Sequence, residues 1–275
     1  MIHPDARIDA SAEIADDAEI GPFVIIGPHC IVGPRCVLHP FSRLASHVTL
    51  HEDVKIHSGA VIGDVPQHLG YKEHPGRVEI GARTILREHV TVHRPHVAGG
   101  VTRIGADCFL MVGSHVAHDC VLGNKVIFVN AATPAGHVTI GDGVLLSGHV
   151  GIHQFVSIGR MAMLSASAQV SMDVPPFVIV EGRNYLEGLN VVGLKRAGYS
   201  PAQRRQLKRV MLHSLQPGVI FAQAITRQRA ELATLPADDT LLAGEFLDWL
   251  AADHPRGVLR FPGGAQKASP EAPEN

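Results

Sequence analysis

Aliphatic residues recur at every sixth position over most of this chain. From position 2 to position 62 each sampled position holds Ile, Val or Leu, and the same phase returns over residues 80–92 and 104–170. Phe128 and Pro134 are the exceptions within these blocks. A period of six fits neither an α-helix, which repeats every 3.6 residues, nor a simple strand, which alternates every two. The chain is therefore expected to form a solenoid of short repeated units.

A second register lies four positions after each aliphatic residue and holds small or β-branched side chains. All four cysteines fall in this register, at Cys30, Cys36, Cys108 and Cys120. They show neither the paired spacing of a metal or redox motif nor the density of a disulfide-rich secreted domain. We therefore expect them to be small core residues.

Turn residues follow the aliphatic positions, as in the stretches IGPF, IGPH and VGPR. Gly and Pro at this point suit tight corners, so three hexapeptides would form one triangular coil of about 18 residues. The pattern resembles that of hexapeptide-repeat proteins, whose coils are left-handed. The resemblance implies an all-β solenoid, a left-handed parallel β-helix, over residues 1–183. The handedness comes from the resemblance, because parallel crossovers are otherwise right-handed.

Two stretches interrupt the repeat without changing its phase, at residues 63–79 and 93–103. We expect each to be a loop extending from an intact coil, and long loops in compact folds are commonly functional. Beyond the solenoid we expect an α-helical C-terminal domain over residues 184–262, which would cap the open sheet edges, and a disordered tail over residues 263–275.

Helical patterns begin after Pro175 and Pro176, where the repeat stops. The stretch Ser200-Pro201-Ala202-Gln203 predicts a capping box with proline at the first helical position. Two further helices are expected over residues 219–235 and 240–252.

Composition excludes several classes of protein. The formal net charge of -2 gives no bias towards nucleic acid or a membrane surface. No apolar run approaches the roughly 18 residues that a membrane-spanning helix needs. The first residues, MIHPDARIDA, lack the basic and apolar regions of a signal peptide. We therefore expect a cytoplasmic protein without a membrane span or a nucleic-acid partner.

Histidines outside the two inward registers are the main candidates for chemistry. His118 lies two positions after Val116, and His137 and His153 follow it by 19 and 35 positions. Because one coil takes about 18 residues and two take about 36, the three rings are expected to stack along nearly one edge. A solvated polar residue is the alternative for any one of them.

Imidazole can act as a general base near neutral pH or as a zinc ligand. Asp119 directly follows His118 and could orient its ring if the chain turns there. A zinc enzyme like the carbonic anhydrases on this type of solenoid is one alternative. Those enzymes pair histidines five apart, whereas His115 and His118 are three apart and His149 and His153 four apart. A non-catalytic scaffold is another alternative.

Several motifs resemble one family closely. The stretches RVEIG, REHVTVHR, HVAHDC, AGHVTI, HQF, DVPPFVI, GLN and GLKRAGY cover most of residues 62–200. They resemble the acyl-carrier-protein–UDP-N-acetylglucosamine O-acyltransferases that begin lipid A synthesis. The resemblance implies transfer of a (3-hydroxy)acyl chain from acyl carrier protein to the 3-position of a UDP-N-acetylglucosamine-type sugar nucleotide. It also implies a homotrimer with active sites between solenoids. It implies no metal and no cofactor beyond the phosphopantetheine of the donor.

The resemblance also assigns residues to roles. His118 matches the general base, Asp119 its neighbour, and the N–H of Gly136 the donor to the oxyanion. Small Ala166 falls where the family measures acyl length, so a medium or long chain is expected. The remaining matches are to substrate-binding positions: Gln67, His115, His137, His153, Gln154, Asn190 and Arg196.

The chain departs from the family pattern on the acceptor side. His68 and Gly70 stand where the family has an acid and a lysine, although Lys72 follows two residues on. Val192 and Ala197 replace an acid and the second of two arginines. A 3-amino sugar nucleotide as acceptor, and coenzyme A as donor, therefore remain alternatives.

Basic residues gather at the start of the helical region. Carrier proteins are acidic, so this cluster is a candidate docking surface, with a solvated helix face as the alternative. Its members are Lys195, Arg196, Arg204, Arg205, Lys208 and Arg209.

Overall fold

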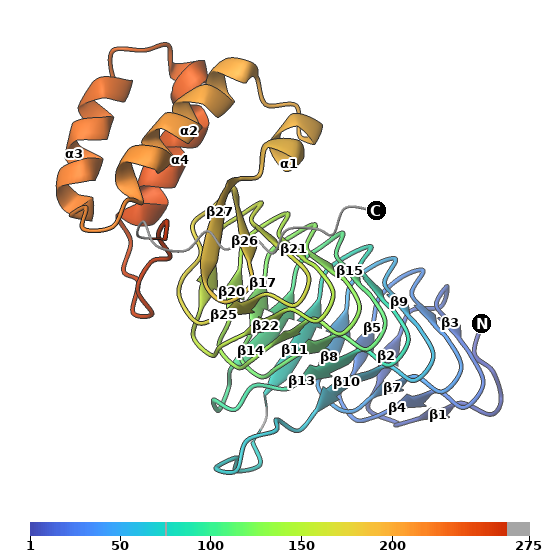
Figure 1. Cartoon of the computed structure of the whole chain (residues 1–275). Helices are drawn as coiled ribbons and strands as arrows, with labels where there is room; N and C mark the ends of the chain where they lie inside the picture. The colour runs from blue at the N-terminus through green and yellow to red at the C-terminus, as the bar shows by residue number, and fades with distance from the viewer. Residues whose placement is uncertain (75, 263–275) are drawn as a thin grey trace, which may run out of the picture.

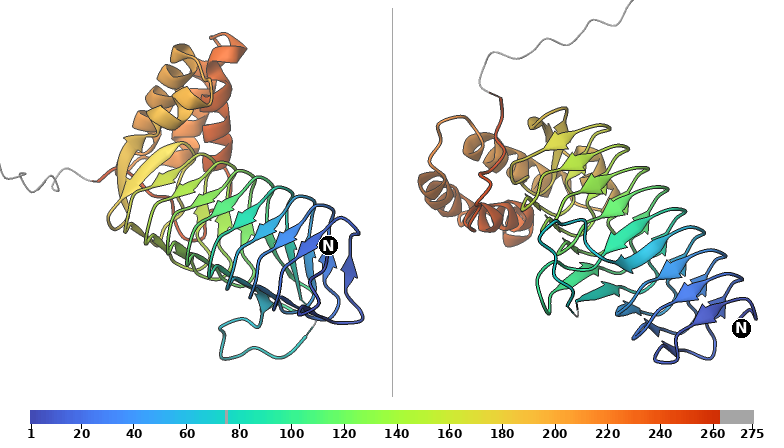
Figure 2. Two further views of the ribbon diagram at one scale, coloured as in Figure 1. Left: turned by 90° about the vertical axis from the view of Figure 1, so that its right-hand side faces the viewer. Right: turned by 90° about the horizontal axis from the view of Figure 1, so that it is seen from below.

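Short parallel strands, most of two residues, build the larger part of the chain. The computed structural model describes residues 1–74 and 76–262. The strands wind into a left-handed parallel β-helix, and four helices gather at the end opposite the N-terminus (Figure 1). The two further views, one from the side and one from below, show the coils stacked in one regular direction (Figure 2). The predicted solenoid with a helical C-terminal region is thus confirmed.

Three faces of the coil carry the sheets. One face holds a six-stranded sheet: β1 (Arg7–Ile8), β4 (Ile25–Ile26), β7 (Arg43–Leu44), β10 (Val61–Asp64), β13 (Thr91–His93) and β16 (His115–Val116). A separate three-stranded sheet comprises β19 (Thr133–Pro134), β22 (Gly151–Ile152) and β25 (Gln169–Val170).

The other two faces are continuous. The second sheet comprises β2 (Glu13–Ile14), β5 (Ile31–Val32), β8 (Val48–Leu50), β11 (Arg77–Ile80), β14 (Val101–Ile104), β17 (Val121–Leu122), β20 (Thr139–Ile140) and β23 (Ser157–Ile158). The third comprises β3 (Glu19–Ile20), β6 (Val37–Leu38), β9 (Lys55–Ile56), β12 (Ile85–Leu86), β15 (Phe109–Leu110), β18 (Ile127–Phe128), β21 (Leu145–Leu146), β24 (Met163–Leu164), β26 (Val178–Glu181) and β27 (Tyr185–Leu189).

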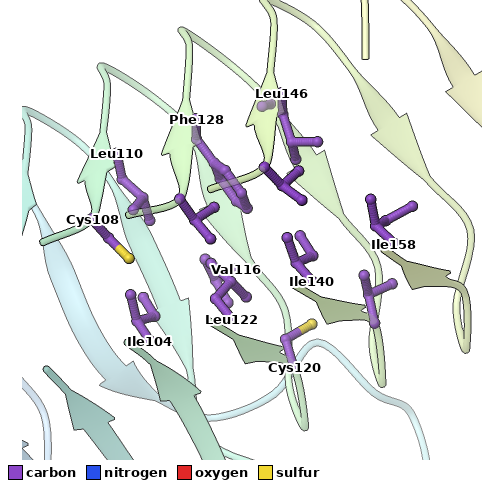
Figure 3. Packing of buried hydrophobic residues seen from close by; sticks show 14 of the residues in the cluster. Ile104, Cys108, Leu110, Val116, Cys120, Leu122, Phe128, Ile140, Leu146 and Ile158 are labelled. Atoms are coloured by element: carbon purple, nitrogen blue, oxygen red, sulfur yellow. The ribbon is translucent and has the colours of Figure 1, made fainter. Parts of the chain in front are cut away.

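Strand pairing sets equivalent residues of neighbouring coils directly over one another. Leu110 pairs with Phe128, and Phe128 with Leu146, each 18 residues further on. Their side chains line up inside the solenoid (Figure 3). Phe128, an exception to the aliphatic pattern, is fully buried in this column. The period of six therefore places one buried side chain on each face of every coil.

The second register is also buried, as predicted. The four cysteines are free and buried. Burial raises the pKa of each thiol, that of Cys120 to about 12, so these groups are poor nucleophiles. Among the described residues, incomplete burial of the two inward registers is confined to the first coil, where the aliphatic Ile2 is 51 % exposed because no coil covers its outer side.

The two interruptions are loops that leave and rejoin the same coils. Strands β10 and β11 occupy the ends of the first interruption, so its irregular part lies within residues 65–76. Strands β13 and β14 likewise limit the second to residues 94–100.

The β-structure continues to Leu189, six residues into the expected helical domain. Strand β27 runs antiparallel to β26 and therefore falls outside the parallel repeat that the hexapeptide period encodes. Helix α1 (Val191–Arg196) follows directly. The period could not predict either element, because neither belongs to a coil.

Three longer helices complete this region: α2 (Pro201–Ser214), α3 (Phe221–Leu232) and α4 (Ala237–Leu250). The predicted capping box is present, since Ser200 accepts from the Gln203 N–H and the Gln203 side chain accepts from the Ser200 N–H. The helices expected over residues 219–235 and 240–252 correspond to α3 and α4. None of the helices in the described residues is long and apolar enough to cross a membrane. The expected tail over residues 263–275 lies outside the described residues.

The inward and outward positions of β20 give a direct test of the register. Ile140 is 1 % exposed in the core, and its neighbour Thr139 faces outward. We expect Ile140→Ala to lower the free energy of unfolding by about 2–5 kcal/mol, because it leaves a cavity. Thr139→Ala should change it by about 0.5 kcal/mol or less. Denaturant unfolding at one fixed protein concentration measures both, and equal losses would contradict the assignment.

Candidate active site

A left-handed corner brings His118 and Asp119 together. Asp119, His137 and Phe155 follow one another at intervals of 18 residues, with φ of 60°, 61° and 66°. This conformation is unusual for residues other than glycine and turns the chain sharply. As a result the two neighbouring side chains converge, and His118 Nδ1 lies 2.8 Å from Asp119 Oδ2. The expected swing of this carboxylate toward the ring is thus observed.

This contact defines the protonation of the His118 ring. An ionised carboxylate only accepts hydrogen bonds, so Nδ1 carries the proton, and in the neutral ring Nε2 then has the free lone pair. Asp119 is itself held in place, because Oδ2 accepts from the His96 N–H at 2.8 Å and its own N–H donates to Thr102 Oγ1 at 2.9 Å. The arrangement suits a general base whose orientation is fixed.

Gly136 lies one coil above His118 and gives its ring room. A Cβ at position 136 would stand 2.4 Å from Cε1 and 2.6 Å from Nε2 of His118. Any larger residue would therefore displace the ring. Within the described residues, the Gly136 N–H donates no hydrogen bond to a backbone carbonyl, so it can donate to a ligand.

The sheet on this face is interrupted at the same place. His115 N–H donates to the Ala132 carbonyl, as its register requires. Among the described residues, however, no bond joins the Ala117 N–H to the Pro134 carbonyl, and the six-stranded sheet ends at β16. A pocket of ≈ 390 Å³ opens across this break. It is lined by Gln67, His68, His93, His115, Ala117, His118, Thr133, Pro134, Ala135, Gly136 and Gln154.

The expected histidine column is only partly present. The rings of His118 and His137 meet edge to face at 5.2 Å between centroids. His137 then stacks on Phe155 at 4.6 Å, so Phe155 and not His153 continues the column. The prediction failed at His153 because that residue lies two positions before the corner. It lines a separate cavity that shares Thr133 with the main pocket.

Both loops close over the site through histidines. The rings of His68 and His96, one from each loop, stack at 3.8 Å, and both meet the His118 ring edge to face. His74 Nε2 lies 2.7 Å from the His96 carbonyl. Sequence reasoning did not assign His96 or His93 to the site. His96 lies in the second loop, and His93 is the last residue of β13, where the second interruption of the repeat begins. These positions were the available signal.

The pocket keeps several imidazoles neutral. Burial lowers the pKa of His115 to about 4, with a further contribution from nearby His93. Burial likewise lowers the pKa values of His93 and His137. His115 Nδ1 lies 2.7 Å from Thr91 Oγ1. Near neutral pH these rings therefore offer hydrogen bonds without adding charge beside His118.

Five residues that the family resemblance assigned to substrates do not line this pocket. His137 contacts the His118 ring and His153 lines the adjoining cavity, whereas Ala166, Asn190 and Arg196 do neither. Asn190 caps α1, accepting from the Gly193 N–H at 3.0 Å and donating to the Met161 carbonyl at 2.9 Å. Arg196 is exposed in the last turn of α1, and Ala166 is exposed on a late coil. One chain alone does not bring them to His118.

The residue types of the site could also hold a divalent metal. Within the described residues, one group of potential ligands has atoms within 4.8 Å of one another: His118, Asp119 and His137. This group differs from the histidine pairs that were compared with those of zinc enzymes in the sequence, His115 with His118 and His149 with His153. The hydrogen bond between His118 and Asp119 accounts for the same proximity without an ion.

Fold and site together define a hexapeptide-repeat transferase. A model described as bacterial transferase hexapeptide matches residues 29–64, and one for the second domain of UDP-N-acetylglucosamine O-acyltransferase matches residues 173–259. The chain belongs to the acyl-[acyl-carrier-protein]–UDP-N-acetylglucosamine O-acyltransferase family, and it is an O-acyltransferase.

Relatives and solved structures agree with this assignment. The relative from Paracoccus denitrificans is 46% identical over 73% of this chain and 74% of its own length. The relative from Anaeromyxobacter is 44% identical over 69% and 74%. The UDP-N-acetylglucosamine acyltransferase of Francisella novicida is 34% identical, covers 95% of both chains and has a TM-score of 0.88. LpxA from Acinetobacter baumannii is 35% identical, covers 94% and 99%, and has a TM-score of 0.87.

The close approach at position 136 leads to a test. Gly136→Ala should push the His118 ring out of place and lower kcat for acyl transfer by about 100-fold, because small misplacements of reacting groups are costly. Gly148→Ala is the matched control, since it also precedes a corner but its Cβ meets nothing closer than 3.6 Å. Steady-state kinetics and thermal unfolding of both variants check this. Equal activity of the two variants would contradict the packing argument.

Proposed function

We propose that this enzyme moves a (3-hydroxy)acyl chain from acyl carrier protein to the 3-hydroxyl of UDP-N-acetylglucosamine or a closely similar sugar nucleotide. The observation that carries the proposal is the His118–Asp119 pair, with the His118 ring packed against Gly136 in the wall of a pocket. The names of the relatives supply the substrates, since each is an acyl-[acyl-carrier-protein]–UDP-N-acetylglucosamine O-acyltransferase.

The geometry accounts for each step. His118 Nε2 takes the proton of the sugar hydroxyl as its oxygen attacks the thioester carbonyl carbon. The N–H of Gly136 donates to the oxyanion of the tetrahedral intermediate. As the intermediate collapses, the C–S bond breaks and the imidazolium returns the proton to the departing thiolate. Asp119 stabilises the imidazolium while it exists.

The chemistry of this route is proton transfer and carbonyl addition. It needs no metal, and the only prosthetic group involved is the phosphopantetheine that the carrier protein brings with the acyl chain. We therefore propose that the enzyme has no cofactor of its own.

Neutral side chains around the base suit an acceptor that is a polar sugar. Gln67, His115 and Gln154 line the pocket with His118, and His137 contacts the catalytic ring. A neutral His115 donates or accepts without raising the local positive charge. We propose that these residues hold the sugar and the thioester, with His153 in the adjoining cavity.

Assembly would complete the site. Ala166, Asn190 and Arg196 lie outside the pocket of their own chain, so they can contact the same substrates only from a neighbouring subunit. This supports a homotrimer with active sites in the clefts between solenoids. Within such a cleft, small Ala166 would leave space for a medium or long acyl chain. We also place the enzyme in the cytoplasm, where acyl carrier protein and nucleotide sugars are made.

The acceptor side is where this chain differs from the family pattern. His68 stands in the pocket in place of an acid, stacked on His96. Gly70 donates its N–H to His68 Nδ1 at 3.1 Å, which ties this short turn together. A 3-amino sugar nucleotide is thus the acceptor to compare with UDP-N-acetylglucosamine.

The proposed function is tested by a mass-spectrometric transfer assay with medium and long 3-hydroxyacyl carrier proteins. We expect a product of added acyl mass with UDP-N-acetylglucosamine. His118→Ala should lower the rate about 100- to 10,000-fold, since that is the usual contribution of a general base. His149→Ala, an exposed corner histidine outside the pocket, is the control and should keep full activity.

Several outcomes would change the proposal. Full activity of His118→Ala would show that His118 is not the general base. Transfer only to the 3-amino analogue would show that the acceptor is a 3-amino sugar nucleotide. Transfer only from acyl coenzyme A would show that the donor is coenzyme A and not acyl carrier protein. Stoichiometric zinc together with loss of activity on chelation would favour a metalloenzyme.

A basic groove on α2 supports docking of the acidic carrier. A cavity of ≈ 540 Å³ lies there, lined by Leu189, Val191, Pro201, Arg204, Arg205, Lys208, Arg209, Leu212 and His213. We therefore propose this groove as the docking surface.

Charge reversal tests the groove. Arg205→Glu with Lys208→Glu should raise KM for acyl carrier protein about tenfold or more at low salt, with KM for the sugar nucleotide unchanged. Arg227→Glu on α3, outside the groove, is the control. Unchanged carrier kinetics at low salt would rule the groove out.

A further inference from the structure

The chain returns to the solenoid after its last helix. Val258 and Leu259 are buried, and Asp173 pairs with this segment through a parallel bridge. The Asp173 N–H donates to the Gly257 carbonyl, and the Leu259 N–H donates to the Asp173 carbonyl, both at 2.8 Å. Residues 254–261, which we call the return segment, are thereby fixed on the late coils.

A partly buried histidine holds the start of this segment in place. His254 Nδ1 lies 3.2 Å from Asp173 Oδ2, and its Nε2 lies 2.8 Å from the Trp249 carbonyl. Burial disfavours the charged ring, but the hydrogen bonds and the Asp173 charge outweigh this and raise the pKa of His254. The ring also packs on Trp249 at 4.0 Å between centroids. The position of Arg256 two residues later is therefore well defined.

Arg256 reaches one of the site histidines. Its Nη2 lies 3.1 Å from His153 Nδ1 and 3.3 Å from the Ser171 carbonyl. The two hydrogens of Nη2 can serve both acceptors. His153 follows Ile152 on β22 and lines a cavity of ≈ 240 Å³ that shares Thr133 with the His118 pocket.

The contact with Arg256 favours one tautomer of His153. A guanidinium is always charged and only donates, so Nδ1 must present its lone pair to Arg256. Nδ1 also lies 3.2 Å from the Gln154 carbonyl, but that bond would need a proton on Nδ1. The two contacts are incompatible, and the permanent charge of Arg256 favours the first. A protonated ring would in addition place two positive charges side by side.

We propose that Arg256 is a positioning residue that holds His153 as the neutral tautomer with its proton on Nε2, so that His153 donates a hydrogen bond to a polar group of the bound substrate. The substrate contact rests on the proposed function, whereas the tautomer does not. The chemistry recognised would be an acceptor atom such as an amide or thioester carbonyl or a phosphate oxygen.

The tautomer is tested without any substrate. Magic-angle-spinning NMR of ¹⁵N-histidine-labelled protein at pH 8 distinguishes the two neutral forms, and His153→Gln identifies the His153 signals by their loss. We expect an unprotonated Nδ1 in the native protein. In Arg256→Ala we expect the proton to move to Nδ1, because the Gln154 carbonyl then becomes its partner. Arg256→Lys, which also donates, should keep the native form. A proton on Nδ1 in the native protein would overturn the proposal, as would no change in Arg256→Ala.

A double-mutant cycle tests the consequence for catalysis. Arg256→Ala should raise KM roughly tenfold for the substrate that His153 contacts, with a smaller effect on kcat. In the His153→Ala background, the same substitution should cause no further increase in KM. Additive effects would show that Arg256 acts independently of His153. Arg260→Ala is the control from the same segment, since Arg260 bonds the carbonyls of Gln216 and Val219 and leaves His153 untouched. It should change stability but not the tautomer.

The two experiments separate the two claims. If the native protein transfers no acyl chain to UDP-N-acetylglucosamine but shows the expected tautomer change, the proposed function fails and the role of Arg256 stands. If transfer occurs but the tautomer is insensitive to Arg256, the proposed function stands and the role of Arg256 fails.

Discussion

The parallel ladder between coils is the constraint on which everything else depends. It sets each residue directly over the one 18 positions further on, as Leu122 over Ile140. On the inside, this register stacks aliphatic side chains into a continuous core. At the corners, the same register stacks Asp119, His137 and Phe155, and places Gly136 against the ring of His118. The site is therefore a local consequence of the repeat, because the residues that surround His118 come from successive coils whose spacing the ladder fixes.

A regular corner and a few departures from the regular coil together shape the site. The corner at Asp119 has the positive φ that corners share along the whole solenoid, and here it lets two adjacent side chains meet instead of pointing apart. The missing bond between Ala117 and Pro134 opens the pocket across the sheet. The two loops then supply His68 and His96 above it. A uniform solenoid would offer only a closed surface, so each deviation has a defined role in shaping the site.

The fold was largely predictable because a period of six is a strong signal of inward-facing positions. The burial of the cysteines followed from the second register, and the pairing of His118 with Asp119 was anticipated from their place at a corner and from family resemblance. The antiparallel strand β27 and helix α1 were not predictable, since they lie outside the repeat. His153 was misplaced on the predicted edge because a spacing of 35 residues ignores the exact corner, and His96 was missed because loops have no register.

The sequence by itself determined the solenoid, the faces its side chains occupy and the residues that could act as base, because these depend on contacts repeated at a fixed interval along the chain. The tertiary structure decided what the interval does not encode. It showed that the loops meet over His118, that burial lowers the pKa of His115, and that the return segment brings Arg256 to His153. These contacts join residues far apart in sequence, and their geometry depends on how separate parts of the chain pack in space.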